Sequence, residues 1–133
     1  GSQISVLHDG ERVRLYLINI VEFDPINSLH LHAEFFDYYD HGTTLEPTHR
    51  TVDTIMQCQA QRGLVEFSYR WPGLYMFHAH QSEFAELGWM GFFRALAEAE
   101  WANGLAEAGI DADWDQRGVA GSTVNPETQE VVR

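Results

Sequence analysis

Two histidine pairs are the residues of this sequence best suited to chemistry. His30 and His32 are separated by one residue, and so are His78 and His80; each pair lies in a short apolar run. Side chains two positions apart on a β-strand point to the same face, so each pair would present two imidazoles side by side. A neutral imidazole nitrogen is a good ligand for copper and zinc. Four convergent imidazoles therefore predict a metal site.

Both pairs lie in segments that we expect to be extended. The run from Leu74 to His80 follows a Pro-Gly turn, is too short for an ordinary helix and is rich in aromatic residues, which favours a strand. The first pair lies in a similarly apolar run from Asn27 to Tyr39. Two strands would then each offer two imidazoles to one side.

The rest of the first 96 residues has the pattern of a small β-protein. Val13, Leu15 and Leu17 share one face of a strand predicted from Arg12 to Val21, and its last residues, 18–21, are apolar enough to be covered on both sides. Further strands are predicted at Ile4 to Leu7, Thr51 to Cys58 and Leu64 to Tyr69, and Met90 to Leu96 is either a final strand or the start of a helix. About seven short strands separated by turns indicate an all-β sandwich or barrel.

The composition changes near residue 95, where alanine and glutamate begin to dominate. We expect one globular domain over residues 3–95 and a helical appendage over residues 96–117 that packs Leu96, Trp101 and Leu105 on the sheet. Residues 118–133 contain few large apolar side chains, which is typical of a tail or linker.

Charge and composition exclude several classes of partner. The formal charge is −12, from 20 acidic and 8 basic residues, and this disfavours nucleic acid, whose phosphates need clustered positive charge. No stretch approaches the run of about 20 apolar residues that spans a bilayer, so we expect no membrane contact by this chain. The single cysteine, Cys58, can form no internal disulfide, and we expect it to be a small buried residue without a catalytic role.

Five short motifs, in this order, resemble a cupredoxin domain of the multicopper oxidase family. They are Gly10–Leu15, Asn27–His32, Thr51–Thr54, Pro72–His80 and Gly88–Gly91. The resemblance covers roughly residues 4–95 and implies a cupredoxin-like Greek-key β-sandwich, copper as the cofactor and an extracytoplasmic location. In this family two cupredoxin domains each give four histidines to a trinuclear copper cluster that reduces oxygen. The resemblance therefore implies that His30, His32, His78 and His80 are one domain's half of such a site.

The sequence departs from the family pattern at the mononuclear type 1 copper that feeds electrons to the cluster. Its cysteine ligand would stand at Ala79, and its histidines at Asn27 and Phe84. Met90 could supply only a weak axial ligand to a copper that lacks its thiolate. The resemblance thus implies no type 1 site, and oxidase chemistry only if a partner domain or subunit completes the centre.

Three arrangements stay open at the histidines. If Ala79 faces the core, His78 and His80 face outward, where a second cupredoxin domain or another copy of the chain would complete a shared site in a homo-oligomer. Alternatively, the four imidazoles close around one zinc or copper ion in a module for metal storage, delivery or sensing. The third is a relic site that serves protein contacts. Glutamates at 34, 83 and 86 lie near the histidines in sequence and could orient them.

Overall fold

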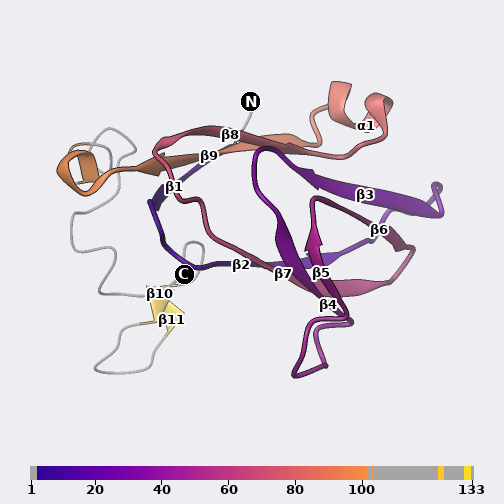
Figure 1. The fold of residues 1–133 in the computed structure, drawn as a ribbon. Helices are drawn as coiled ribbons and strands as arrows, with labels where there is room; N and C mark the ends of the chain where they lie inside the picture. Colours follow the sequence, from indigo (N-terminus) through magenta and orange to yellow (C-terminus); the bar gives the residue numbers. More distant parts are fainter. Residues whose placement is uncertain (1–2, 102, 104–122, 125–130, 133) are drawn as a thin grey trace.

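Two β-sheets face each other as the layers of a sandwich in the computed structural model (Figure 1), which describes residues 3–101, 103, 123–124 and 131–132. The larger, five-stranded sheet has the order β1-β9-β8-β3-β6, and the smaller, four-stranded sheet has the order β2-β7-β4-β5. Strands β1 and β9 are parallel, and the other neighbours in both sheets are antiparallel. The predicted all-β sandwich is confirmed.

The larger sheet consists of β1 Gln3–His8, β3 Ile26–Leu31, β6 Thr54–Cys58, β8 Gly73–His78 and β9 Met90–Leu96. The smaller sheet consists of β2 Val13–Ile18, β4 Phe36–Asp40, β5 His49–Val52 and β7 Arg62–Phe67. A short helix, α1 Ser82–Glu86, follows β8, and one turn of 3-10 helix, η1 Glu98–Glu100, follows β9. Strands β10 Thr123–Val124 and β11 Val131–Val132 form a separate antiparallel pair.

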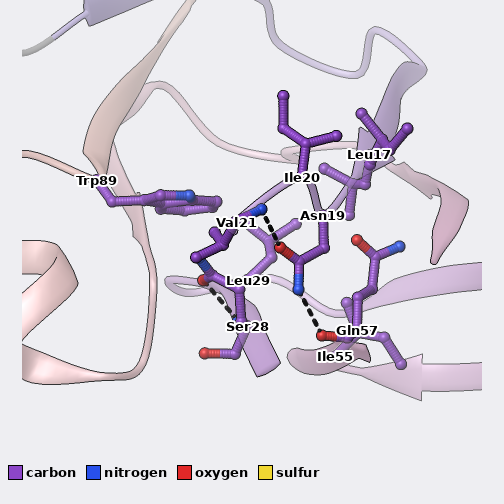
Figure 2. Close-up of a pocket in the computed structure, with 11 residues that line it drawn as sticks. Leu17, Asn19, Ile20, Val21, Ser28, Leu29, Ile55, Gln57 and Trp89 are labelled. Carbon is purple, nitrogen blue, oxygen red and sulfur yellow. Dashed lines mark hydrogen bonds between the residues drawn. The ribbon is translucent and has the colours of Figure 1, made fainter. Parts of the chain in front are cut away.

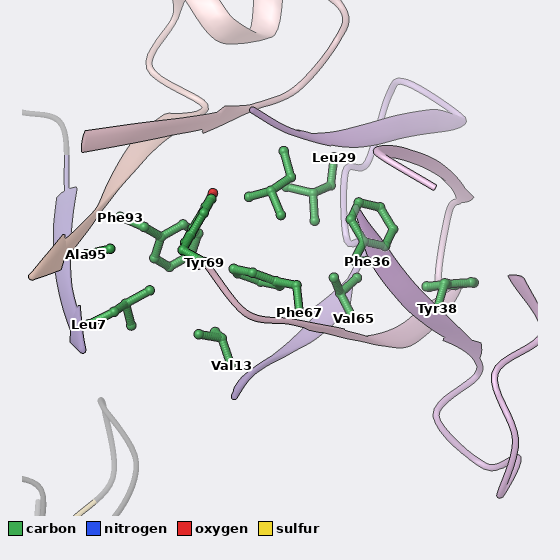
Figure 3. Close-up of a cluster of buried hydrophobic side chains, with 11 residues drawn as sticks. Leu7, Val13, Leu29, Phe36, Tyr38, Val65, Phe67, Tyr69, Phe93 and Ala95 are labelled. Atoms are coloured by element: carbon green, nitrogen blue, oxygen red, sulfur yellow. The ribbon is translucent and has the colours of Figure 1, made fainter. Parts of the chain in front are cut away.

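The core fills the space between the two sheets with alternate residues of each strand (Figure 3). Leu31, Phe36 and Val65 are at most 1% exposed, and the rings of Tyr69 and Tyr75 stack with centroids 3.9 Å apart. Because side chains alternate along a strand, the inward residues of β3 leave its histidines on the outer face of the larger sheet. The same alternation confirms the inward face predicted for β2.

Two predicted strands are each divided between the sheets, so these predictions were wrong. The run from Asn27 to Tyr39 begins in β3 of the larger sheet and continues in β4 of the smaller sheet. Ala33, which lies between these two strands, has φ 62°. The run from Thr51 to Cys58 divides likewise into β5 and β6, at Asp53. Thr51, with φ 58°, lies inside β5, where the pairing with β4 shifts register. A left-handed backbone turns the chain sharply, and at Ala33 it carries the chain from one layer to the other.

Two expectations of burial were also wrong. Strand β2 ends at Ile18, and Ile18 and Ile20 are 59% and 78% exposed. They are exposed because β2 is an edge strand and because Asn19 leaves the sheet, where its Nδ2–H donates to the Gln57 carbonyl (2.9 Å). Cys58 is exposed because it ends β6, an edge strand of the larger sheet.

The other predicted strands are confirmed with small shifts of their ends. Leu96 and Trp101 pack with Val6 in a second apolar cluster, as expected, whereas Leu105, the rest of the helical appendage and most of the predicted tail lie outside the described residues. No helix in the described part of the chain is long and apolar enough to span a membrane.

Candidate metal centre

Adjacent strands bring the two histidine pairs together. Strands β3 and β8 are antiparallel neighbours in which His30 and His78 are directly opposed. Leu31 and Ala79, which separate the members of each pair, are 1% and 0% exposed, so both pairs point away from the core. The two-residue period of the strand is therefore enough to place imidazoles from distant parts of the sequence on one outer surface.

Three of the four imidazoles lie within metal-binding range of one another. One ring nitrogen from each of His30, His32 and His78 lies within 4.8 Å of the other two. The closest approach is 3.0 Å, between Nε2 of His32 and Nε2 of His78. Two imidazole nitrogens that share a tetrahedral ion at about 2.0 Å are roughly 3.3 Å apart. This pair therefore needs only a small adjustment to bind one ion.

His80 lies at the edge of this group. Its ring centroid is 5.3 Å from that of His30 and 5.8 Å from that of His78, but none of its nitrogens belongs to the group of three. Its backbone is held against β3 because its N–H donates to Ser28 Oγ (2.9 Å), while its side chain is exposed. His80 thus has an anchored backbone and an imidazole with access to solvent.

Backbone acceptors determine which ring nitrogen is free to bind metal. His78 Nδ1 lies 2.5 Å from the Ala79 carbonyl oxygen, and His30 Nδ1 lies 3.0 Å from the Asp53 carbonyl oxygen. A carbonyl oxygen only accepts hydrogen bonds, so Nδ1 carries the proton in both rings and Nε2 keeps its lone pair. Both histidines are thereby prepared to bind an ion through Nε2.

A short chain of hydrogen bonds through Thr54 and Asp53 orients the ring of His30. Thr54 Oγ1 donates to the Asp53 carboxylate (3.1 Å) and lies 2.8 Å from His30 Nδ1, whose N–H it accepts. An acceptor behind a ligand histidine fixes the orientation of the ring and raises its basicity. The family-like segment Thr51–Thr54 thus contributes the outer contacts of His30.

The three glutamates considered from sequence have no such role. No hydrogen bond in the described part of the chain joins Glu34, Glu83 or Glu86 to these histidines; Glu34 instead accepts the N–H of Phe35 (3.0 Å). The metal-binding group contains no carboxylate among the described residues. Charge alone was therefore a misleading signal for the outer contacts.

Local electrostatics favour a neutral imidazole at His32. Partial burial lowers the pKa of His32, and the nearby His30, His78 and His80 lower it further because two positive charges close together repel. A histidine whose pKa lies below its ordinary value is neutral at neutral pH, and only the neutral ring can bind a metal ion.

The positions that would hold a type 1 copper carry no thiolate. Ala79 is fully buried, and its N–H donates to the Trp89 carbonyl (3.1 Å). Asn27 is buried and accepts the backbone N–H of Ser28 (2.7 Å). The one cysteine of the sequence, Cys58, is exposed on an edge strand. The expected absence of a type 1 cysteine agrees with this arrangement.

Comparisons with known proteins give a consistent result. The family model described as multicopper oxidase matches residues 1–98. A solved structure described as a multicopper oxidase is 55% identical over 68% of this chain and 32% of its own, with a TM-score of 0.66. The chain thus spans about a third of the length of that protein. A search of curated proteins found no match.

More distant structures share the fold. The copper nitrite reductase from Nitrosomonas europaea is 19% identical over 71% of this chain and 32% of its own, with a TM-score of 0.61. A multicopper oxidase from Campylobacter jejuni, described as a metallo-oxidase, is 23% identical over 73% of this chain and 20% of its own, with a TM-score of 0.58.

Proposed function

Because this chain belongs to the multicopper oxidase family, we propose that it is a copper-binding cupredoxin domain whose ligands are His30, His32, His78 and His80. The observation that carries the proposal is the 3.0 Å approach of the Nε2 atoms of His32 and His78. The donor set suits copper, which binds imidazole well. The histidines also suit it individually, because carbonyl acceptors hold the Nδ1 protons of His30 and His78 on the side away from the ion.

The proposed site is one half of a shared centre. Four histidines on the outer face of a sheet leave their metal open to a partner, and three apolar residues on the same face, Ile26, Met56 and Leu74, are 38%, 59% and 58% exposed. Exposed apolar side chains beside a ligand cluster favour a protein contact. We propose that a second cupredoxin domain of a longer parent, or another copy of this chain, covers this face.

The chemistry of the completed site follows from what each part supplies. Bound copper supplies a redox centre that can react with oxygen. His30 and His78 would hold the ion through neutral Nε2 atoms, and each keeps its Nδ1 proton on a backbone or hydroxyl acceptor. Because no thiolate stands at Ala79, electrons must enter from elsewhere, so oxidase activity requires the partner. By family resemblance we also propose an extracytoplasmic location.

A closed mononuclear site is the second candidate. Three imidazole nitrogens of a single chain already lie within 4.8 Å of one another, so zinc or copper could be bound without a partner. A rotation of the exposed His80 ring would supply the fourth ligand of a tetrahedral ion. Such a site would store, deliver or sense metal and would have no oxidase activity.

Metal content and association state distinguish these candidates. Elemental analysis, electron paramagnetic resonance and sedimentation of the purified chain would be recorded with and without copper. More than one copper per chain, or association that depends on metal, supports the shared centre; one ion on a monomer supports the mononuclear module. If neither copper nor zinc raises the unfolding temperature, both candidates fail, because a ligand of the folded state must stabilise it.

A pair of variants locates the site. His32→Ala should abolish tight metal binding, because it removes one member of the closest nitrogen pair. His41→Ala is the matched control, since His41 is an exposed histidine of the β4–β5 connection. Equal metal binding by the two variants would contradict the assignment of the ligands.

A further inference from the structure

A cavity of about 300 Å³ lies beside β3 at the end of the sandwich where β2 ends (Figure 2). Leu17, Leu29, Ile55 and Trp89 supply apolar parts of its wall. Ile20, which also lines it, is 78% exposed, so the cavity opens to solvent at the segment after β2. The volume is at the lower end of the range for pockets that bind small molecules.

Among the described residues, the cavity wall contains no charged side chain. Its polar members are one serine, three amide side chains and the indole of Trp89. A charged ligand would lose its hydration here without gaining an ion pair, which is strongly unfavourable. The wall therefore selects a neutral ligand.

Two buried amides meet at the cavity. Asn27 on β3 and Gln57 on β6 are directly opposed and are 7% and 6% exposed. Asn27 Oδ1 accepts the N–H of Ser28 (2.7 Å), and Gln57 Nε2 donates to the hydroxyl of Tyr38 (3.2 Å). One donor group, Asn27 Nδ2, and one acceptor, Gln57 Oε1, are left without a protein partner in the described part of the chain.

Both residues line the cavity, and these two unpaired atoms are not sealed in the packed core. Every fully buried side-chain nitrogen or oxygen among the described residues has a hydrogen-bond partner. Asn27 Nδ2 and Gln57 Oε1 have none and both residues line the cavity, so the cavity is where the two atoms remain accessible. A ligand that left them unpaired would bind poorly, because an unsatisfied polar group in a dry site is costly.

We propose that this cavity binds a small, neutral aromatic molecule that carries an amide group. The ligand carbonyl accepts a hydrogen bond from Asn27 Nδ2, and its N–H donates one to Gln57 Oε1. Its ring packs against Leu29, Ile55 and the indole of Trp89. The cavity accommodates about ten non-hydrogen atoms, a size at which ligands bind efficiently for each atom. The proposal does not depend on a metal ion at the histidines.

Benzamide is the probe that matches this description. Backbone and indole N–H signals of the ¹⁵N-labelled chain would be followed by nuclear magnetic resonance in the presence of a metal chelator. We expect a saturable shift of the Trp89 indole signal with a Kd of about 1 mM or tighter, as expected for a ligand of this size. Benzoate and ethylbenzene have nearly the same size, but one is charged and the other lacks the amide. Each should bind at least about tenfold more weakly.

Two tryptophan substitutions test the location. Val21→Trp places a bulky ring at the cavity and should weaken benzamide binding at least about tenfold, while the backbone N–H of Val21 keeps its bond to Asn19 Oδ1 (3.1 Å). Leu45→Trp is the matched control, because Leu45 is 97% exposed and does not line the cavity, and it should bind benzamide like the unmodified chain.

Asn27→Leu removes the free donor and should also reduce benzamide affinity at least about tenfold, with little effect on ethylbenzene. The proposal fails if benzamide gives no saturable shift. It also fails if the three ligands bind alike, or if Val21→Trp binds benzamide as well as Leu45→Trp does. Because the measurements are made without metal, these outcomes leave the proposed copper site untouched.

Discussion

Removing the hydroxyl of Thr54 tests the proposed copper site without touching a ligand. Thr54 Oγ1 lies 2.8 Å from His30 Nδ1 and passes the interaction on to the Asp53 carboxylate at 3.1 Å. Thr54→Val keeps the shape and the β-branching of the side chain while it removes this acceptor. Thr54→Ser is the matched control, since it keeps the hydroxyl and loses only a methyl group.

The expected loss of copper affinity follows from what remains behind His30. Loss of the outer partner of a ligand histidine typically reduces metal affinity 10–100-fold. Here the Nδ1 proton keeps the Asp53 carbonyl as an acceptor at 3.0 Å, so the loss should lie near the lower limit, about tenfold or about 1.4 kcal/mol. Thr54 is exposed on an edge strand, and the free energy of unfolding without metal should change by no more than about 0.5 kcal/mol.

The assay is a competition titration in which the protein and a chromophoric chelator share limiting copper. The free energy of unfolding of each metal-free variant is measured alongside by urea denaturation. Thr54→Ser should bind copper within about twofold of the unmodified chain. If Thr54→Val also binds within that margin while remaining folded, then either His30 is not a ligand or its orientation does not depend on these hydrogen bonds, and the reasoning is refuted.

Two further predictions concern stability. Gly63→Ala should lower the free energy of unfolding by about 1–3 kcal/mol, because its new methyl group would overlap the buried ring of Tyr38; a urea midpoint equal to that of the unmodified chain would contradict this. The backbone carbonyl of Asp9 and the carboxylate of Glu98 raise the pKa of His8 above 6.5. This contribution to stability should be complete below about pH 6.5 and lost as pH rises through the folded-state pKa, and Glu98→Gln should flatten that dependence in urea midpoints.

The strands were predictable where side chains alternate, and they were misjudged where the backbone turns. Residues 13–17 show a two-residue period that burial confirms on one face, and in β8 Tyr75 and Phe77 pack against the core. The chain crosses between the layers at Ala33, which has φ 62°, and at Asp53, between β5 and β6. Left-handed backbone is usually marked by glycine or asparagine, and neither stands at position 33. The sequence therefore contained no local signal for the break at Ala33.

The candidate metal site was also predictable only in part. The spacing of the histidines was sufficient to expect two pairs on one surface, because strand geometry depends only on position. The acceptors behind them could not be identified in this way, since two are backbone carbonyls, of Asp53 and Ala79, and every residue has a carbonyl. Thr54 was recognisable only through its family-like segment. Three nearby glutamates were candidates because of their charge, but they form no hydrogen bond to the histidines.

Strand β3 separates the two proposed sites by the alternation of its own side chains. Asn27 and Leu29 face the core side and line the cavity, whereas His30 faces outward toward the metal centre. Substitutions on one face should therefore leave the other site intact, provided that the register of the strand is kept. Ser28 is the exception, because it lines the cavity and its Oγ also accepts the N–H of His80. A change at Ser28 is the one substitution on β3 that should affect both sites together.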